Sequence, residues 1–209
     1  MPIFSMDSKF MQALSRLSDL IILNILFLLT CIPIFTIGAA STAMYTVAFR
    51  LGTEEEEGVF RCYFRSFLKN FKQGTALLLM LLVPILLLCC SFLFFLASPW
   101  RVLAYLCVPL LVLLVLIGGY VFPLLSQFQN TVAATAKNAL LMGIGYLPQS
   151  ILVAVLNCIP LMLFIFSTLF FFQMGIVWIL VYFSAAAYIN AQILKKIFAP
   201  YQTPEEERP

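Results

Sequence analysis

The sequence predicts an all-α fold, a polytopic bundle of transmembrane helices, and two observations lead to it. Of the 209 residues, 63% are hydrophobic and 10% charged, with a mean hydropathy of +1.06, whereas soluble domains are roughly half apolar and a quarter charged. The charges also gather in short segments, and several stretches between them reach the roughly 20 apolar residues that a membrane-crossing helix needs. We expect a single membrane domain, residues 1–209, with about six membrane segments.

The first element, residues 20–51, predicts a short helical hairpin with its turn at PIFTIG, residues 33–38. Basic residues favour the cytoplasmic side, and they flank this segment on both sides, with Lys9 and Arg16 before it and a basic segment after it. The hairpin should therefore return to its starting side. Because each arm is short for a full span, it either crosses narrowly or is re-entrant. A cleavable signal peptide is the alternative, since GAA at residues 38–40 resembles a cleavage site.

Residues 54–73, EEEEGVFRCYFRSFLKNFKQ, predict an amphipathic helix lying in the cytoplasmic membrane interface. Apolar residues recur at helical spacing along one face, and basic residues occupy the opposite face. Each basic residue near anionic headgroups contributes on the order of 1 kcal/mol, so the helix either anchors to lipid or docks to a partner. The apolar face consists of Phe60, Tyr63, Phe64, Phe67, Leu68 and Phe71, and the basic face of Arg61, Arg65, Lys69 and Lys72.

Two further helical hairpins are predicted at residues 74–127 and 147–194. The first joins two uncharged stretches through a short turn, and the second is too long for one helix and is split near Gln173. Lys137 lies between the hairpins and Lys195 follows the second one. By the distribution of basic residues, the segments around Lys137 and Lys195 and both chain termini are expected in the cytoplasm.

Small residues gather where helices should approach closely. In lipid, Gly, Ala, Ser and Thr let helix backbones come near one another, and such residues form GAASTA at 38–43 and an Ala-rich segment after residue 132. They serve either internal packing or contact with another subunit. Together with the amphipathic helix, they give the predicted partner-binding residues: Gly38, Ser41, Thr42, Tyr45, Phe60, Arg61, Arg65, Lys69, Lys72, Ala133, Ala136 and Lys137.

Neutral polar residues lie within the apolar segments, whereas ionisable residues do not occupy their centres. Because charged residues inside a membrane usually mark ion or proton paths, this pattern argues against a proton-coupled pump. The neutral residues either hydrogen-bond between helices or line a path for an uncharged solute. The candidates are Asn24, Thr36, Asn157, Ser184 and Asn190.

The chain offers no recognisable catalytic apparatus. It contains no histidine, and its six cysteines show no CxxC spacing, which disfavours a general base or a zinc site of the common kinds. Motifs for nucleotide hydrolysis or a serine nucleophile do not occur either. We therefore expect no enzymatic activity, no catalytic residues, no metal, no cofactor and no nucleic-acid partner.

Four blocks of the sequence resemble the YesL family of bacterial integral membrane proteins. They are FTIGAASTAMYTVAFRL (35–51), FRSFLKNFKQ (64–73), YVFPLLSQFQNTVAATAKNALL (120–141) and AYINAQILKKIFAPYQ (187–202). The resemblance implies a bacterial cell membrane and an association with carbohydrate use, because family members are commonly encoded beside sugar ABC importers and glycan-degrading enzymes. It implies no catalytic residues.

Two functions follow as expectations. The first is a non-enzymatic accessory or subunit of a carbohydrate ABC importer. Its expected partners are membrane lipids and permease subunits, and the sequence leaves open whether the protein also forms a homo-oligomer. AATAKNALLMGIGYLP at 133–148 lacks the Glu and the spacing of a permease loop that contacts the ATPase, so contact should run through helix packing. The second is a stand-alone transporter or channel for a small neutral solute. A membrane enzyme is disfavoured.

Overall fold

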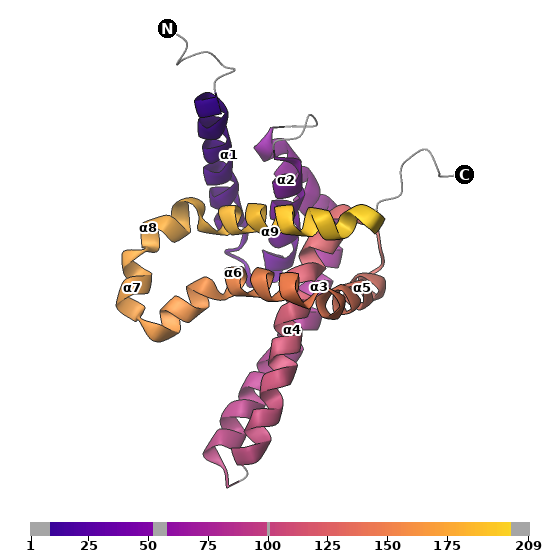
Figure 1. Cartoon of the computed structure of the whole chain (residues 1–209), viewed down its shortest axis with the longest axis vertical. Helices are drawn as coiled ribbons and strands as arrows, with labels where there is room; N and C mark the ends of the chain where they lie inside the picture. The colour runs from indigo at the N-terminus through magenta and orange to yellow at the C-terminus, as the bar shows by residue number, and fades with distance from the viewer. Residues whose placement is uncertain (1–8, 52–57, 100, 202–209) are drawn as a thin grey trace, which may run out of the picture.

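The computed structural model describes residues 9–51, 58–99 and 101–201, and these residues form helices and short connections (Figure 1). No strand occurs in this described part, which confirms the all-α prediction. The longer helices, in chain order, are α1 (Lys9–Thr30), α2 (Ile37–Arg50), α3 (Val59–Ala97), α4 (Arg101–Gln127), α5 (Val132–Gly145), α6 (Leu147–Phe166) and α9 (Phe183–Phe198). The shorter ones are η2 (Ile34–Thr36), α7 (Thr168–Gln173), α8 (Gly175–Val177), the π-helix η3 (Trp178–Tyr182) and η4 (Ala199–Tyr201).

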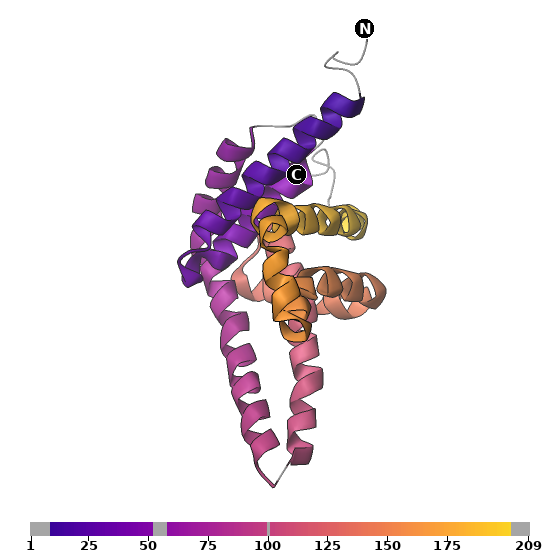
Figure 2. The same ribbon diagram turned by 90° about the vertical axis from the view of Figure 1, so that its left-hand side faces the viewer.

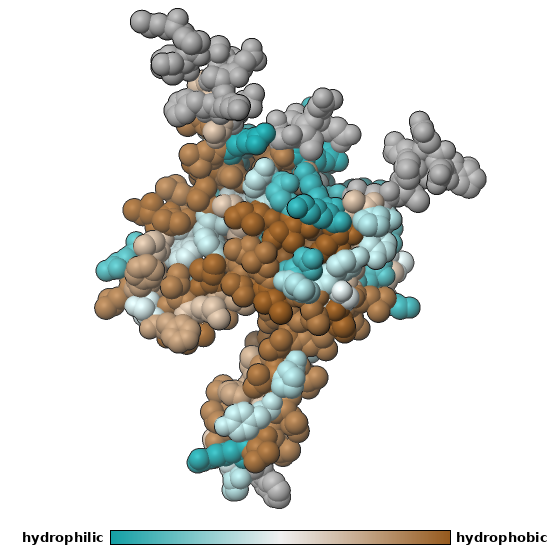
Figure 3. All heavy atoms as spheres, in the orientation of Figure 1, coloured by the Kyte–Doolittle hydropathy of each residue, from teal (hydrophilic) through white to brown (hydrophobic). Residues whose placement is uncertain are grey.

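Helix length and composition identify a multi-pass membrane protein. Five segments of the described chain are long and apolar enough to cross a bilayer. Figure 3 shows hydrophobic residues over most of one face, with hydrophilic residues concentrated toward the end where the chain termini emerge. The five segments are Ala13–Thr30, Val59–Ala97, Arg101–Gln127, Leu147–Phe166 and Gly175–Tyr201.

The N-terminal hairpin is present. Helix α1 ends at Thr30, and α2 runs back beside it from Ile37 (Figure 1). Helix α2 has 14 residues and most of them are buried, because it contacts α1, α3, α4 and α9. At 1.5 Å per residue it is about 21 Å long, less than the roughly 30 Å of a hydrocarbon core. Gly38, predicted as the last residue of the turn, is the second residue of α2.

Two glycines bring α2 and α3 into backbone contact. A Cβ atom added to Gly38 would lie 2.1 Å from the carbonyl oxygen of Gly74, and one added to Gly74 would lie 2.8 Å from the backbone nitrogen of Ala39. No side chain fits at such distances. The small residues at the start of α2 are thus used for internal packing, one of the two predicted uses.

Helix α3 corrects the prediction of a separate interfacial helix at 54–73. It begins at Val59 and continues without a break to Ala97; residues 54–57 lie outside the described part. Gly74 does not end this helix. It lies within it, at the close contact with α2. At about 58 Å, α3 is longer than a bilayer core is thick, and its basic first part continues directly into its apolar second part.

The two predicted hairpins extend in different directions. The distal half of the α3–α4 hairpin projects away from the rest of the molecule, whereas α6 and α9 run across it (Figures 1 and 2). Helix α5 and the non-helical residue Tyr146 change the chain direction between them. The predicted break near Gln173 occurs at Met174, and a further break at Ser167 was not predicted.

Candidate functional sites

Asn24 of α1 is fully buried and joins α1 to the π-helix. Its Nδ2 donates to the carbonyl oxygens of Trp178 at 2.9 Å and Ile179 at 2.7 Å. Its Oδ1 accepts from the backbone N–H of Ser184 at 3.0 Å. Where backbone hydrogen bonding changes from the π-helical to the α-helical pattern, some backbone groups lack their usual partners. The Asn24 side chain bonds to three backbone groups at this change. The Ser184 hydroxyl adds a bond to the carbonyl oxygen of Leu20 at 2.7 Å.

Asn190 of α9 is also fully buried, but its amide is only partly satisfied. Its Nδ2 donates to the Tyr45 hydroxyl at 3.2 Å and to Asn157 Oδ1 at 3.0 Å. Its Oδ1 has no hydrogen-bond partner in the described part of the chain. Buried polar atoms in native proteins nearly always have a partner, so this three-residue polar cluster is incomplete.

A cavity of about 260 Å³ adjoins the polar cluster; we call it the α2–α6 cavity. Two members of the cluster, Tyr45 and Asn157, line it together with Ser41. Its remaining walls are apolar or aromatic and come from α1, α2, α4, α6 and the region around residue 183. The cavity therefore combines an apolar body with one polar region, as binding pockets for small molecules commonly do.

The predicted polar-path residues do not line one path. Asn24 and Ser184 bond α1 to the end of the π-helix, and the Thr36 hydroxyl bonds to the carbonyl oxygens of Thr30 and Pro33 in the hairpin turn. These three serve hydrogen bonding within the fold. Only Asn157 and Asn190 form one cluster, which they share with Tyr45.

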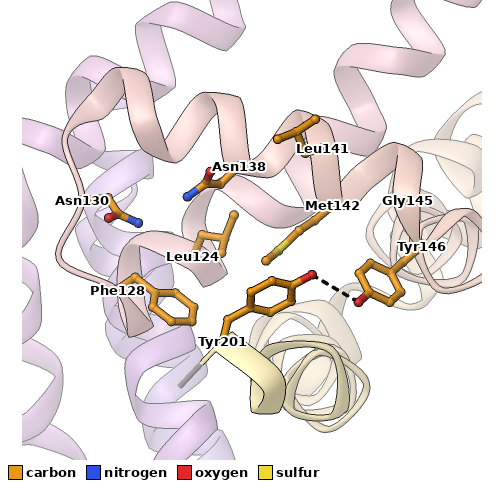
Figure 4. Close-up of a pocket in the computed structure, with 9 residues that line it drawn as sticks. All are labelled: Leu124, Phe128, Asn130, Asn138, Leu141, Met142, Gly145, Tyr146 and Tyr201. Atoms are coloured by element: carbon orange, nitrogen blue, oxygen red, sulfur yellow. Dashed lines mark hydrogen bonds between the residues drawn. The ribbon is translucent and has the colours of Figure 1, made fainter. Parts of the chain in front are cut away.

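A second and wider pocket of about 610 Å³ lies where α4, α5 and η4 meet (Figure 4). Its polar groups are Asn130, Asn138 and the hydroxyls of Tyr146 and Tyr201, which lie 3.5 Å apart. The Tyr201 hydroxyl raises the pKa of Tyr146 above its ordinary value, because the hydrogen bond favours the neutral phenol. This pair could not be found from the sequence, because the two tyrosines lie 55 positions apart and no local pattern links them.

The basic residues of α3 form an exposed row. Arg61, Arg65, Lys69 and Lys72 are all exposed, and the row rises about 16 Å along the helix axis. Two residues of the predicted apolar face are exposed, Phe60 at 63% and Leu68 at 71%. Among the six predicted apolar residues only Tyr63 is fully buried. Cys62 and Ser66, not assigned to that face, are buried beside it.

The remaining predicted partner-binding residues divide into two groups. The first group lies on α2: Gly38, Thr42 and Tyr45 are buried within the chain, and Ser41 is half-buried and lines the α2–α6 cavity. Ala133, Ala136 and Lys137 line an apolar groove of about 370 Å³ between α3, α4 and α5, which we call the α5 groove. Because Ala133 and Lys137 are exposed, this second group remains accessible to another protein or to lipid.

No group of three or more potential metal ligands occurs in the described part of the chain. The fold and these sites define an α-helical, multi-pass membrane protein with neutral polar clusters between its helices. Residues 20–92 match the family described as "Protein of unknown function, DUF624". The match covers half of α1, all of α2 and most of α3. No curated protein and no solved structure matches the chain.

Proposed function

We propose that this protein is a non-enzymatic membrane accessory of a bacterial carbohydrate ABC importer, located in the cell membrane with both termini in the cytoplasm. The observation that carries the proposal is the α5 groove. Its walls are apolar, and the alanines Ala133 and Ala136 leave room for a helix of another protein to approach closely. The distal α3–α4 hairpin offers further exposed apolar surface.

The carbohydrate context is supported by sequence similarity. The four sequence blocks resemble the YesL family, which carries the DUF624 domain matched by residues 20–92. The neighbouring importer genes of that family suggest permease subunits as partners. The exposed row on α3 supplies positive charge outside the apolar part of that helix, suited to an acidic cytoplasmic surface.

Copurification from native membranes tests this proposal. In mild detergent, tagged protein should recover ABC permease subunits. The double variant Ala133→Leu and Ala136→Leu should reduce recovery at least tenfold, because leucines fill the α5 groove. Ala76→Leu is the matched control, since Ala76 is exposed on α3 and does not line the groove. Wild-type protein that purifies without a permease would contradict the proposal.

A second candidate function is that of a stand-alone carrier for a small neutral solute. The α2–α6 cavity favours it, because Ser41, Tyr45 and Asn157 give an otherwise apolar cavity a hydrogen-bonding region. Liposomes that contain only this protein separate the two functions. Uptake of neutral solutes there supports the carrier, and uptake no faster than in empty liposomes rejects it.

A further inference from the structure

We propose that the α2–α6 cavity binds a neutral acylglycerol, a fatty-acid ester of glycerol, with its ester and hydroxyl groups at the cavity-lining side chains of Ser41, Tyr45 and Asn157. This inference does not depend on docking to a permease. It rests on the hydrogen-bonding groups around the cavity, on their charge and on the surface onto which the cavity opens.

The cavity offers hydrogen-bond donors to a ligand. Ser41 lines it and forms no hydrogen bond with the described part of the chain. Asn157 uses its Oδ1 to accept from Asn190, and its Nδ2 has two protons, of which the neighbouring Tyr45 hydroxyl can accept one. At least one N–H therefore remains. These donors match the carbonyl oxygen of an ester.

The cluster also needs a donor from outside. Asn190 Oδ1 is buried and has no partner in the described part of the chain, and leaving such an acceptor unpaired costs about 1–3 kcal/mol. Asn190 itself does not line the cavity, but its partners Tyr45 and Asn157 do, so a ligand acts on Asn190 through these two side chains. A glycerol ester carries hydroxyl donors together with its carbonyl acceptor, so its headgroup can bond to either of them.

Charge limits the ligand to neutral headgroups. No Asp, Glu, Lys or Arg lines the cavity, so a phosphate or a carboxylate would lose its hydration without gaining a counter-charge, which is strongly unfavourable. A neutral ester loses much less hydration. Phospholipids and free fatty acids are therefore poorer ligands for this site than acylglycerols.

The surroundings of Asn157 indicate that the ligand arrives from the hydrocarbon phase. Asn157 is exposed near the middle of the apolar helix α6, about 15 Å from either end. Leu161, one turn further along the helix, is 60% exposed, and Val155 is 46% exposed. In a membrane such a surface contacts acyl chains. The aromatic walls, among them Phe27 and Phe122, suit the chain of the ligand.

Trp178 provides a reporter for a binding experiment. Its ring lies 4.6 Å, centroid to centroid, from that of Tyr182, which lines the cavity. The sequence contains two tryptophans, so the substitution Trp100→Phe leaves Trp178 as the sole one. This protein is placed in nanodiscs of diether phosphatidylcholine, which lack ester carbonyls. The probes are a monoglyceride with a brominated acyl chain and the matching brominated glycerol ether.

The ester should quench Trp178 fluorescence at about a tenfold lower mole fraction than the ether, because only the ester has a carbonyl acceptor. Ser41→Ala and Asn157→Leu should each reduce this preference severalfold. Ser41→Ala removes a hydroxyl with no bond in the described chain, so it should fold normally. Ala154→Leu fills the cavity and should remove specific quenching by both probes; Val155→Leu, outside the lining, is the control.

Equal quenching by ester and ether in the Trp100→Phe protein would overturn the proposal, because it means that acyl chains fill the cavity without headgroup recognition. Absence of quenching by either probe would overturn it as well. So would an ester preference that persists unchanged in both Ser41→Ala and Asn157→Leu. An anionic brominated fatty acid that binds as tightly as the ester would contradict the argument from charge.

Discussion

Asn24 and Asn190 are both fully buried asparagines in apolar helices, and they differ in how completely the fold satisfies them. Asn24 bonds to the carbonyl oxygens of Trp178 and Ile179, the first two residues of the π-helix, and to the backbone N–H of Ser184 just after it. Asn190 bonds through its nitrogen only, and its oxygen has no partner in the described chain. The comparison separates an asparagine whose hydrogen bonds the fold completes from one whose oxygen the described chain leaves without a partner.

The surroundings of the two asparagines differ accordingly. The partners of Asn24 are mainly backbone groups, which cannot rearrange without unwinding a helix. The partners of Asn190 are the side chains of Tyr45 and Asn157, which line a cavity. Side chains can exchange partners when a ligand enters. We therefore expect substitutions at Asn24 to affect folding and substitutions around Asn190 to affect binding.

The largest loss of stability is expected from a substitution that forces the backbones of α2 and α3 apart. Gly38→Ala should lower the free energy of unfolding by about 3 kcal/mol or more, because the added Cβ would lie 2.1 Å from the carbonyl oxygen of Gly74 and α2 must move. Unfolding in mild detergent measures it. Gly145→Ala is the control, since nothing lies within 4 Å of a Cβ there. Equal stability of the two variants would show that α2 and α3 do not cross this closely.

Asn24→Leu should give the next largest effect. It leaves three backbone groups of the π-helix junction unpaired, and at roughly 0.6–1 kcal/mol for each bond the loss is about 2 kcal/mol. The same unfolding measurement applies. The matched control is Asn138→Leu, because Asn138 is half-buried and forms no hydrogen bond in the described chain. A loss no greater than that of the control would mean that the π-helix does not need Asn24.

Asn190→Leu should change stability less, by about 1 kcal/mol or below in either direction. The substitution removes two hydrogen bonds, but it also removes a buried oxygen that lacks a partner, and these effects oppose one another. Unfolding of Asn190→Leu and Asn24→Leu in lipid-free detergent measures the difference between their free energies of unfolding. An effect of Asn190→Leu as large as that of Asn24→Leu would remove the distinction between the two residues.

Ser41→Ala should have the smallest effect on folding. Its hydroxyl lines the cavity without a hydrogen bond to the described chain, so the free energy of unfolding should change by less than about 0.5 kcal/mol. Thr42→Ala is a useful companion, because the Thr42 hydroxyl is buried and bonds to the carbonyl oxygen of Gly38 at 2.9 Å. If Ser41→Ala were the more destabilising of the two, its hydroxyl would have a structural role.

The sequence predicts the existence of most helices but not their partners. Apolar stretches identify α3, α4 and α6, and the Pro-containing turn identifies the α1–α2 hairpin. The bonds of Asn24 could not be predicted, because its acceptors lie 154 and 155 positions away, and no local signal announces a π-helix there. Asn24 and Asn190 look alike in sequence, since both are single asparagines in apolar surroundings.

Burial along α3 does not follow its aromatic residues. Phe60 and Leu68 are exposed while Cys62 and Ser66 are buried. Close packing against α2 favours small residues over large ones at the contact. For the same reason, Gly74 indicates a helix crossing and not a helix end. Hydropathy periodicity alone cannot distinguish these cases.

The central claim is that Asn24 forms hydrogen bonds that the fold needs, whereas Asn190 supports two side chains, Tyr45 and Asn157, that line a binding cavity. The most direct test is the shift in unfolding temperature when a monoglyceride is added to protein in diether nanodiscs. We predict a clear rise for the wild type and for Ala76→Leu, and little or none for Asn190→Leu. An equal rise in the wild type and in Asn190→Leu would contradict the account.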